Sequence, residues 1–319
     1  MRVGVFVSET WGAPSTVAQV QERAAQAEQL GFASAWTPYL PWSVDALAAI
    51  QAAASVTQRI ELGTAVVPTY LFHPLALARS AATVHDASGG RLTLGIGPSQ
   101  PTVIEAMHGI PFTKPAHHTR EYLEILRSAM SGAARVEHGG ELYQVASMFG
   151  VPSDHDKAEM PILVGALGAL MLRVAGELAD GTIATSCDEG AIERVIVPGV
   201  TAAAAAAGRR APRVGTVLAI CVTDGAGLDA AREQMTAHFS TYERIPRYAR
   251  MLSLGNKERM GDVHIVGDEV TVRARLQAFR DAGLTDLLAA PFVPQPATDV
   301  EAARLPTLEL LADIAARGF

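Results

Sequence analysis

Segments with strand-like and helix-like patterns alternate along the chain, and this alternation restricts the fold more than any other feature of the sequence. Short apolar runs such as Val3–Val7 and Arg91–Ile96 are separated by stretches with helical spacing, such as Thr16–Leu30 and Thr119–Met130. Strands that alternate with helices pair in parallel through right-handed crossovers. Eight such units predict an α/β fold, a (β/α)8 barrel of the TIM type with its active site at the C-terminal ends of the strands. An open, doubly wound sheet is the structural alternative.

Eight segments are the predicted strands of this barrel. They are Val3–Val7, Ala33–Trp36, Ile60–Val67, Arg91–Ile96, Ile162–Val164, Thr182–Thr185, Val214–Val222 and Asp286–Ala289. Three long loop insertions interrupt the pattern, at Pro98–Ala116, Arg135–Pro161 and Tyr242–Ile265, and no domain boundary is visible. We therefore expect one domain over residues 1–319, and we expect the insertions to carry function because long ordered loops often do.

The composition argues against several classes of function. Hydrophobic residues make up 49% of the 319 residues and charged residues 18%, so a large core can be buried. The formal net charge of −7 argues against a nucleic-acid partner. The two cysteines, Cys187 and Cys221, predict no disulfide framework and favour a reducing compartment. The N-terminus lacks the layout of a signal peptide, and no apolar run reaches the about 20 residues of a membrane helix. We therefore expect a cytoplasmic protein without a membrane partner.

Two stretches with glycines follow predicted strands and could bring a ligand close to the backbone. Gly95–Gln100 ends the fourth strand, where glycines let a flat or anionic ligand approach, and a simple turn is the alternative. Gly165–Gly168 joins the fifth strand to a helix whose N-terminal amides could bind phosphate. A tight turn of the kind found in any barrel explains this second stretch equally well.

Other polar residues have a structural explanation. His73 precedes a proline at a helix start and is interpreted as a cap or packing residue rather than a base. Cys187 follows the sixth strand and is interpreted as a small packing residue. No spacing of His, Asp and Glu predicts a metal site, and no nucleophile–base arrangement is found.

Several stretches together give the sequence a family likeness. They follow one another in the order Glu28–Trp36, Leu62–Pro68, His73–Ala78, Ser88–Gly97, Arg120–Leu126, Pro161–Gly168, Ala175–Gly181 and Ile265–Gly283. In this order they resemble the bacterial luciferase-like superfamily, and within it the actinobacterial coenzyme F420-dependent oxidoreductases. Each motif is loose, but the ordered set is specific and spans nearly the whole chain.

The resemblance implies a luciferase-like barrel that holds a deazaflavin or flavin, F420 or alternatively FMN, at the C-terminal ends of its strands. It also implies a cis peptide bond between Ala65 and Val66, whose bulge backs the cofactor ring. A homodimer is expected, since dimers are usual in this family. The residues to which the resemblance assigns cofactor binding are Pro38, Ala65, Val66, Gly97, the phosphate-binding turn of Gly165, Ala166, Leu167 and Gly168, and Thr185 and Ser186.

The sequence departs from the family at the two positions that would carry acid–base chemistry. Many relatives have Asp-His after the second strand, where this chain has Pro38 and Tyr39, although Trp42 is retained. Relatives often have a Glu after the glycines of the fourth strand, where Gln100 stands here. Tyr39 and Gln100 are therefore the candidate catalytic residues, but Gln100 does not titrate and the usual acid–base pair is in doubt.

The same comparison predicts the class of substrate. The branch of the family that oxidises glucose 6-phosphate carries a Lys shortly after the sixth strand, where this chain has Asp188. We therefore expect a small neutral or apolar substrate with an alkene, imine or carbonyl. Arg244, Arg247 and Arg250 are interpreted as a solvated helix face, with contact to the acidic tail of F420 as the alternative. The residues predicted to line the substrate pocket are Trp42, Asp188, Met148 and Phe149.

Three functions compete on these grounds. The first, which we expect, is an F420-dependent oxidoreductase that transfers hydride between the deazaflavin and its substrate. The second is a monooxygenase that uses reduced FMN on the same barrel. The third is a non-catalytic protein that binds a flavin or deazaflavin, a possibility raised by Pro38, Tyr39 and Gln100.

Overall fold

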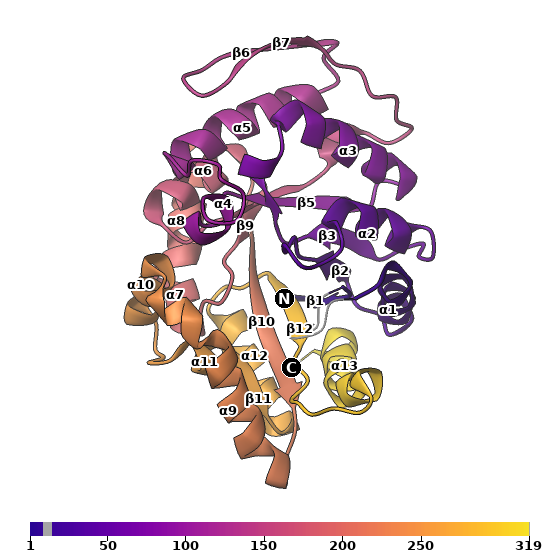
Figure 1. Cartoon of the computed structure of the whole chain (residues 1–319), viewed down its shortest axis with the longest axis vertical. Coiled ribbons are helices and arrows are strands. Elements are labelled where there is room, and N and C mark those ends of the chain that lie inside the picture. The colour runs from indigo at the N-terminus through magenta and orange to yellow at the C-terminus, as the bar shows by residue number, and fades with distance from the viewer. Residues whose placement is uncertain (9–14, 319) are drawn as a thin grey trace.

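The computed structural model describes residues 1–8 and 15–318, and eight parallel strands of this part of the chain close into a barrel (Figure 1). Neighbouring strands follow the order β1-β2-β3-β5-β8-β9-β10-β12, and the pairing of β12 with β1 closes the ring. The predicted (β/α)8 barrel is therefore confirmed, and the open sheet is excluded. The barrel strands are β1 (Arg2–Phe6), β2 (Ser34–Thr37), β3 (Glu61–Thr64), β5 (Leu92–Gly97), β8 (Ile162–Gly165), β9 (Gly181–Ile183), β10 (Arg213–Val222) and β12 (Asp286–Pro291).

Helices surround the barrel (Figure 1). The longer ones are α1 (Val17–Gln29), α2 (Ala46–Ala54), α3 (Pro74–Ala87), α5 (Pro115–Met130), α6 (Ala169–Leu178), α8 (Val197–Ala206), α9 (Leu228–Phe239), α12 (Glu269–Asp281) and α13 (Val300–Arg317). The shorter ones are α4 (Pro101–Ile104), α7 (Glu189–Ala191), α10 (Pro246–Leu254) and α11 (Met260–Val263), and a π-helical segment, Ile192–Ile196, joins α7 to α8. Within the described ranges, no helix combines the length and the apolar character needed to cross a bilayer.

The three predicted insertions each contain secondary structure of their own. The first, Pro98–Ala116, contains α4 and the start of α5. The second, Arg135–Pro161, contains an antiparallel hairpin of β6 (Arg135–Gly139) and β7 (Gln144–Met148). The third, Tyr242–Ile265, contains α10 and α11. These additions explain why the chain is longer than the about 250 residues of a typical barrel.

The sheet also contains a short strand that the sequence analysis did not predict. This strand, β11 (Ile265–Gly267), pairs in parallel with the end of β10. Ile220 of β10 pairs with Pro291 of β12 and also with Ile265 of β11. Because β12 occupies one edge of β10, β11 lies along the other edge, beyond the point where β9 ends.

The third predicted strand is interrupted rather than continuous. Its first part, β3, pairs Gly63 with Thr93 of β5, and a second part, β4 (Val67–Pro68), pairs Val67 with Ile96. Between these two pairs the third strand advances by four residues while β5 advances by three. The third strand therefore contains one extra residue, as in a β-bulge. The bulge contains Ala65 and Val66, and the peptide bond between them is cis, as the resemblance implied.

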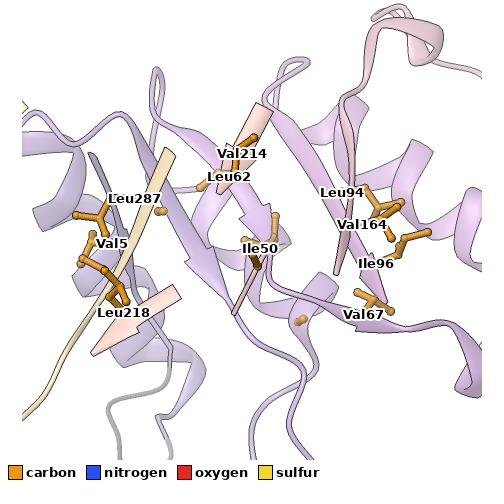
Figure 2. Packing of buried hydrophobic residues seen from close by; sticks show 14 of the residues in the cluster. Val5, Ile50, Leu62, Val67, Leu94, Ile96, Val164, Val214, Leu218 and Leu287 are labelled. Atoms are coloured by element: carbon orange, nitrogen blue, oxygen red, sulfur yellow. The ribbon is translucent and has the colours of Figure 1, made fainter. Parts of the chain in front are cut away.

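Side chains on the barrel strands alternate between the helix layer and the barrel interior. On β12, Leu287 and Ala289 belong to the hydrophobic cluster shared with the helices, whereas Leu288 and Ala290 belong to the interior cluster. Because both faces are buried, the strands appear in the sequence as continuous apolar runs. The members of the first cluster labelled in Figure 2 are Val5, Ile50, Leu62, Val67, Leu94, Ile96, Val164, Val214, Leu218 and Leu287.

Trp36 fills the middle of the barrel interior. Its side chain is fully buried, and its Nε1 donates a hydrogen bond to Ser34 Oγ at 2.8 Å. A Cβ atom at Gly63 would lie 2.2 Å from Cζ3 of the indole, and one at Gly4 would lie 2.7 Å from Nε1. The inward positions of the neighbouring strands therefore need glycine to leave room for the ring.

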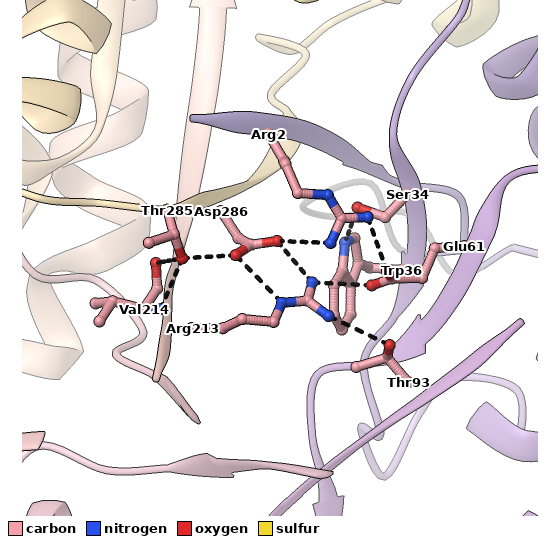
Figure 3. A network of polar contacts seen from close by, with 9 residues as sticks. All are labelled: Arg2, Ser34, Trp36, Glu61, Thr93, Arg213, Val214, Thr285 and Asp286. Carbon is pink, nitrogen blue, oxygen red and sulfur yellow. Dashed lines mark hydrogen bonds and ion pairs between the residues drawn. The ribbon is translucent and has the colours of Figure 1, made fainter. Parts of the chain in front are cut away.

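Paired charges close the N-terminal end of the barrel (Figure 3). Arg213 Nη2 lies 2.6 Å from Asp286 Oδ1 and 2.9 Å from Glu61 Oε1. Arg2 Nη2 lies 2.7 Å from Glu61 Oε2, and its Nη1 lies 3.3 Å from Asp286 Oδ1. Burial by itself would lower the pKa of Arg213, but hydrogen bonds and the charges of Asp286 and Glu61 outweigh it and raise that pKa. Each of these charges therefore has an opposite partner inside the protein.

We predict that Asp286→Asn lowers the free energy of unfolding by about 3–5 kcal/mol, because it removes one partner of a buried ion pair. The side chain of Asp286 is 3% exposed, whereas that of Arg2 is 42% exposed. The control variant Arg2→Met should therefore cost less than about 1 kcal/mol. Urea unfolding of both variants measures the difference, and equal losses would contradict the importance assigned to the buried pair.

Candidate active site

The barrel interior ends, at the C-terminal ends of the strands, in a floor that exposes Ala65 and Val66. A cluster of buried side chains fills the interior below this floor, and Ala65 and Val66 pack against it while remaining partly exposed. Because both residues follow β3 directly, they lie at the end of the barrel where enzymes of this architecture carry their chemistry. The buried members of the cluster are Phe6, Trp36, Leu163, Ile183, Val217, Leu288 and Ala290.

Glycines on the neighbouring strands fit closely around this bulge. A Cβ atom at Gly97 would lie 2.8 Å from Val66 Cγ2, and one at Gly165 would lie 3.5 Å from the same atom. Thr64 fixes the start of the bulge, since its Oγ1 donates to Gly95 O at 2.8 Å and accepts from Gly95 N at 2.9 Å. The structure thus brings together Ala65, Val66, Gly97 and Gly165, which the sequence analysis selected from three separate stretches.

The turn Gly165–Gly168 leads into the N-terminus of α6. Ala166 and Leu167 are buried, whereas Gly168, the N-cap residue, is exposed and provides no side-chain hydrogen bond to the helix. A Cβ atom at Gly168 would have no neighbour within 4 Å. The first amides of α6 therefore begin at an open position, and such amides favour an anionic ligand.

The end of β9 places Ser186 in an unusual backbone conformation. Ser186 has a φ of 53°, which is left-handed and costs a residue other than glycine roughly 1–2 kcal/mol. Its Oγ is buried and has no hydrogen-bond partner in the described part of the chain. Ser99, which follows β5, has a φ of 63°. Strained positions of this kind cluster at functional sites, and both lie at the C-terminal end of the barrel.

The loop after β2 contributes aromatic side chains to the same end of the barrel. Pro38 is buried, Tyr39 is half-buried with its ring 5.6 Å from that of Phe72, and Trp42 is 58% exposed. Burial raises the pKa of the Tyr39 hydroxyl, and the charge of Asp45 raises it further. Tyr39 therefore remains protonated at neutral pH and can donate a hydrogen bond, but it cannot act as a base.

Gln100 and Arg247 meet across two of the insertions. Arg247, on α10, donates a hydrogen bond from Nη2 to Gln100 Oε1 at 3.3 Å. This pair was not predicted from the sequence, because the arginines of this segment were interpreted as a solvated helix face. Arg244 and Arg250 are exposed, as expected, whereas Arg247 is half-buried. A pattern of charges alone does not reveal which member of a run contacts a distant loop.

Two predicted pocket residues, Met148 and Phe149, are far from this end of the barrel, and that prediction was wrong. Met148 pairs with Arg135, and Phe149 N donates to Ala134 O, so both lie beside the end of α5. Since α5 starts at the C-terminal end of β5 and runs back along the barrel, its end lies near the opposite mouth. The hairpin covers the outside of α5 (Figure 1), where the Glu121 carboxylate accepts backbone N–H groups from it.

Asp188 has a structural role instead of the predicted place in the pocket. Its side chain caps α7 by accepting from Ala191 N at 2.8 Å, and its other oxygen accepts from Asn256 N. The residue is 2% exposed, so its carboxylate is not available to a substrate. The next residue, Glu189, forms ion pairs with Lys257 and Arg275, each at 3.2 Å.

The residues with structural interpretations lie as expected. His73 is the N-cap of α3, and its Nδ1 accepts a hydrogen bond from Leu75 N at 3.3 Å. Cys187 is buried, and burial raises the pKa of its thiol far above the usual value. A polar cavity of about 580 Å³ lies between α9, α11, β11 and α12, with Arg232, Lys257 and Arg275 in its lining. No predicted site residue lines this cavity.

Comparisons with known proteins agree with this geometry. A family model described as luciferase-like monooxygenase matches residues 1–286. A Mycobacterium tuberculosis protein whose name gives it as a coenzyme F420-dependent oxidoreductase is 35% identical over 54% of this chain and about half, 52%, of its own length. A 5,10-methylenetetrahydromethanopterin reductase of Methanopyrus kandleri is 25% identical over 86% of this chain and 89% of its own.

A solved structure shares the fold over the full length. An F420-dependent secondary alcohol dehydrogenase, bound to an F420–acetone adduct, superposes with a TM-score of 0.80 at 17% identity, covering 100% of this chain and 99% of that one. At this identity the likeness shows the architecture alone.

Proposed function

The chain belongs to the luciferase-like monooxygenase family, and on that premise we propose that it is an F420-dependent oxidoreductase acting on a small neutral or apolar substrate. That it is an oxidoreductase follows from its relatives, several of which are named for F420-dependent or reductase activities. The identity of the cofactor and the class of substrate are the parts that we propose. When bound, reduced F420 would supply a hydride, and the protein would bind and orient the two reactants.

The observation that carries the proposal is the floor formed by Ala65 and Val66. A planar ring needs a flat apolar support from which side chains do not project, and glycines at 97 and 165 keep the neighbouring strands clear. The geometry suits such a ring, since the side-chain atom nearest to a Cβ at either glycine is Cγ2 of Val66. A polar ligand ring stacked here would also be shielded from water on its lower face by the interior cluster.

The turn before α6 and the end of β9 suit the phosphate of the same cofactor. The open N-terminus of α6 offers backbone N–H groups without a competing side chain. Thr185 is half-buried beside Ser186, whose Oγ is buried and unpartnered and would reach a ligand oxygen once the side chain turned toward the mouth. Pro38 and Gly97 would contribute backbone surface at the other end of the cofactor.

The substrate would bind against Trp42, Tyr39 and Gln100. None of these three side chains is charged, and after β9 the cations Lys257 and Arg275 are both paired with Glu189. The cation beside Gln100, Arg247, is directed at the amide oxygen of that residue. This arrangement favours a neutral substrate. Asp188 does not contribute to this preference, because its carboxylate is buried within the protein.

A monooxygenase that uses reduced FMN is the second candidate, because the family model carries that description. The phosphate-binding turn suits either cofactor, so the choice between F420 and FMN rests on binding. A non-catalytic binding protein remains the third candidate, since neither Tyr39 nor Gln100 can act as a general base.

We predict that the purified protein binds F420 with micromolar or tighter affinity and FMN more weakly. The ordered motifs and the named relatives favour the deazaflavin. Fluorescence titration of each cofactor measures both constants under the same conditions. Tighter binding of FMN than of F420 would overturn the assignment and favour the monooxygenase.

We predict that Gly168→Val weakens cofactor binding about tenfold while the protein still folds. The residue has a φ of −91° and no atom within 4 Å of a Cβ, so valine fits the protein but blocks access to the amides of α6. The matched control is Gly150→Val, because a Cβ atom at Gly150 would also have no neighbour within 4 Å and this residue lies outside the site. Unchanged affinity in a folded Gly168→Val protein would place the phosphate elsewhere.

We predict that the F420-loaded enzyme reduces cyclic enones or imines and leaves glucose 6-phosphate unreacted. The reason is that the side chains of Trp42, Tyr39 and Gln100 are uncharged and that Lys257 and Arg275 are paired with Glu189. Loss or gain of F420 absorbance in a panel assay follows turnover directly. Efficient turnover of sugar phosphates, with enones and imines untouched, would refute the substrate class.

A further inference from the structure

The contact between Arg247 and Gln100 fixes how the amide of Gln100 is oriented. Arg247 Nη2 lies 3.3 Å from Gln100 Oε1, and a guanidinium carries only hydrogen-bond donors. The atom that faces Arg247 must therefore be the amide oxygen and not the amide nitrogen. It follows that the amide nitrogen, with its two N–H groups, is directed away from Arg247.

That nitrogen is not used to hold the local fold. Gln100 is the N-cap residue of α4, yet its side chain makes no capping hydrogen bond. In residues 1–8 and 15–318 the only hydrogen bond of its side chain is the one to Arg247. The helix start is held instead by the backbone, since Gln100 O accepts from Val103 N and Ile104 N. A half-buried donor without an acceptor among the described residues is thus available.

The donor lies at the mouth of the barrel. Gln100 stands three residues after Gly97, whose backbone packs against Val66 in the floor. Ser99, with its φ of 63°, turns the chain between them. The Cα atoms of Gly97 and Gln100 are therefore close, at most about 11 Å apart along an extended chain.

We propose that Arg247 positions Gln100 so that the amide nitrogen donates a hydrogen bond to the carbonyl oxygen or imine nitrogen of the substrate. This inference rests on the proposed function and narrows its substrate class, because an alkene without a conjugated acceptor atom would gain nothing from the donor. Arg247 is a positioning residue, whereas Gln100 contacts the substrate. A neutral amide gives this hydrogen bond at every pH at which the protein is folded.

The hydrogen bond favours hydride addition because negative charge gathers on the acceptor atom. For a ketone, the carbonyl carbon gains the hydride, the π electron pair moves to oxygen, and the oxygen takes a proton from water. For an enone reduced at its double bond, the β-carbon gains the hydride, the oxygen carries the enolate charge, and the α-carbon then takes the proton. In the proposed function the hydride would come from reduced F420, and one proton would pass from that cofactor to water, so that electrons and atoms balance. One donor aimed at such a charge accelerates a reaction by about 100-fold or more.

The test uses cyclohexenone labelled with carbon-13 at its carbonyl as the probe. In the complex of the protein with oxidised F420, which cannot react, infrared difference spectroscopy should show the carbonyl stretch shifted to lower frequency than in buffer. Gln100→Met should abolish the shift, and Arg247→Met should reduce it because the amide is then free to turn. Arg247→Lys, which still carries only donors, should restore most of it. A merely structural role of either residue would not move this frequency.

Turnover of the same probe with reduced F420 gives the second measurement. Gln100→Glu replaces the donor by a carboxylate of the same shape paired with Arg247, and kcat should fall about 100-fold at pH 7, with partial recovery on acidification. Gln100→Met combined with Arg247→Met should be no slower than Gln100→Met alone. The control is Arg250→Met, an exposed arginine of the same helix, which should leave kcat unchanged.

The outcomes separate this inference from the proposed function. If F420 does not bind, the proposed function fails and the inference fails with it. If F420 binds but neither cyclohexenone nor an imine binds the loaded protein, the assigned substrate class is wrong. If the probe binds and reacts, but the carbonyl frequency is the same with and without Gln100, the proposed function stands and this inference is overturned.

Discussion

The ion pairs of Arg213 with Asp286 and Glu61 determine how the barrel is closed. These residues begin β10, β12 and β3, three strands that are distant in sequence, and their charges meet inside the N-terminal end of the barrel. A charge buried without a partner would be strongly destabilising, so the three strands are held in the one register that pairs all of them. Because side chains alternate between the two faces of a strand, the first inward residue determines which later residues of that strand also point into the barrel.

The layers above follow from that register. Trp36 occupies the middle layer only because Gly4 and Gly63 leave the space that its ring needs. The next inward layer on the third strand is the bulge of Ala65 and Val66, which ends the packed interior at the opposite mouth. The floor of the candidate site is therefore the last layer of the core rather than a feature of the loops, and its position depends on the packing below it.

The sequence was sufficient to predict elements whose signal is local. The eight barrel strands and the three insertions were identified because apolar runs and helical spacing repeat over many residues, and the cis bond at Ala65 was inferred from family likeness. The strand Ile265–Gly267 was missed because three residues give no period. Met148 was wrongly assigned to the substrate pocket because it is apolar, although it is 71% exposed. Hydrophobicity alone does not predict on which side of a helix a hairpin packs. The contact of Arg247 with Gln100 spans 147 residues, a separation at which a single sequence gives no signal.

The electrostatics of the site explain why an amide suits position 100 better than an acid. A carboxylic acid beside the guanidinium of Arg247 would ionise at neutral pH, because a nearby positive charge lowers the pKa of a carboxyl group. It would then accept hydrogen bonds but could not donate one. The hydroxyl of Tyr39 remains protonated, since its pKa is raised by burial and by Asp45. With an amide at 100 and a protonated phenol at 39, two neutral donors lie at the mouth of the barrel beside the cation of Arg247. Neutral donors suit a substrate that develops negative charge only as it accepts a hydride.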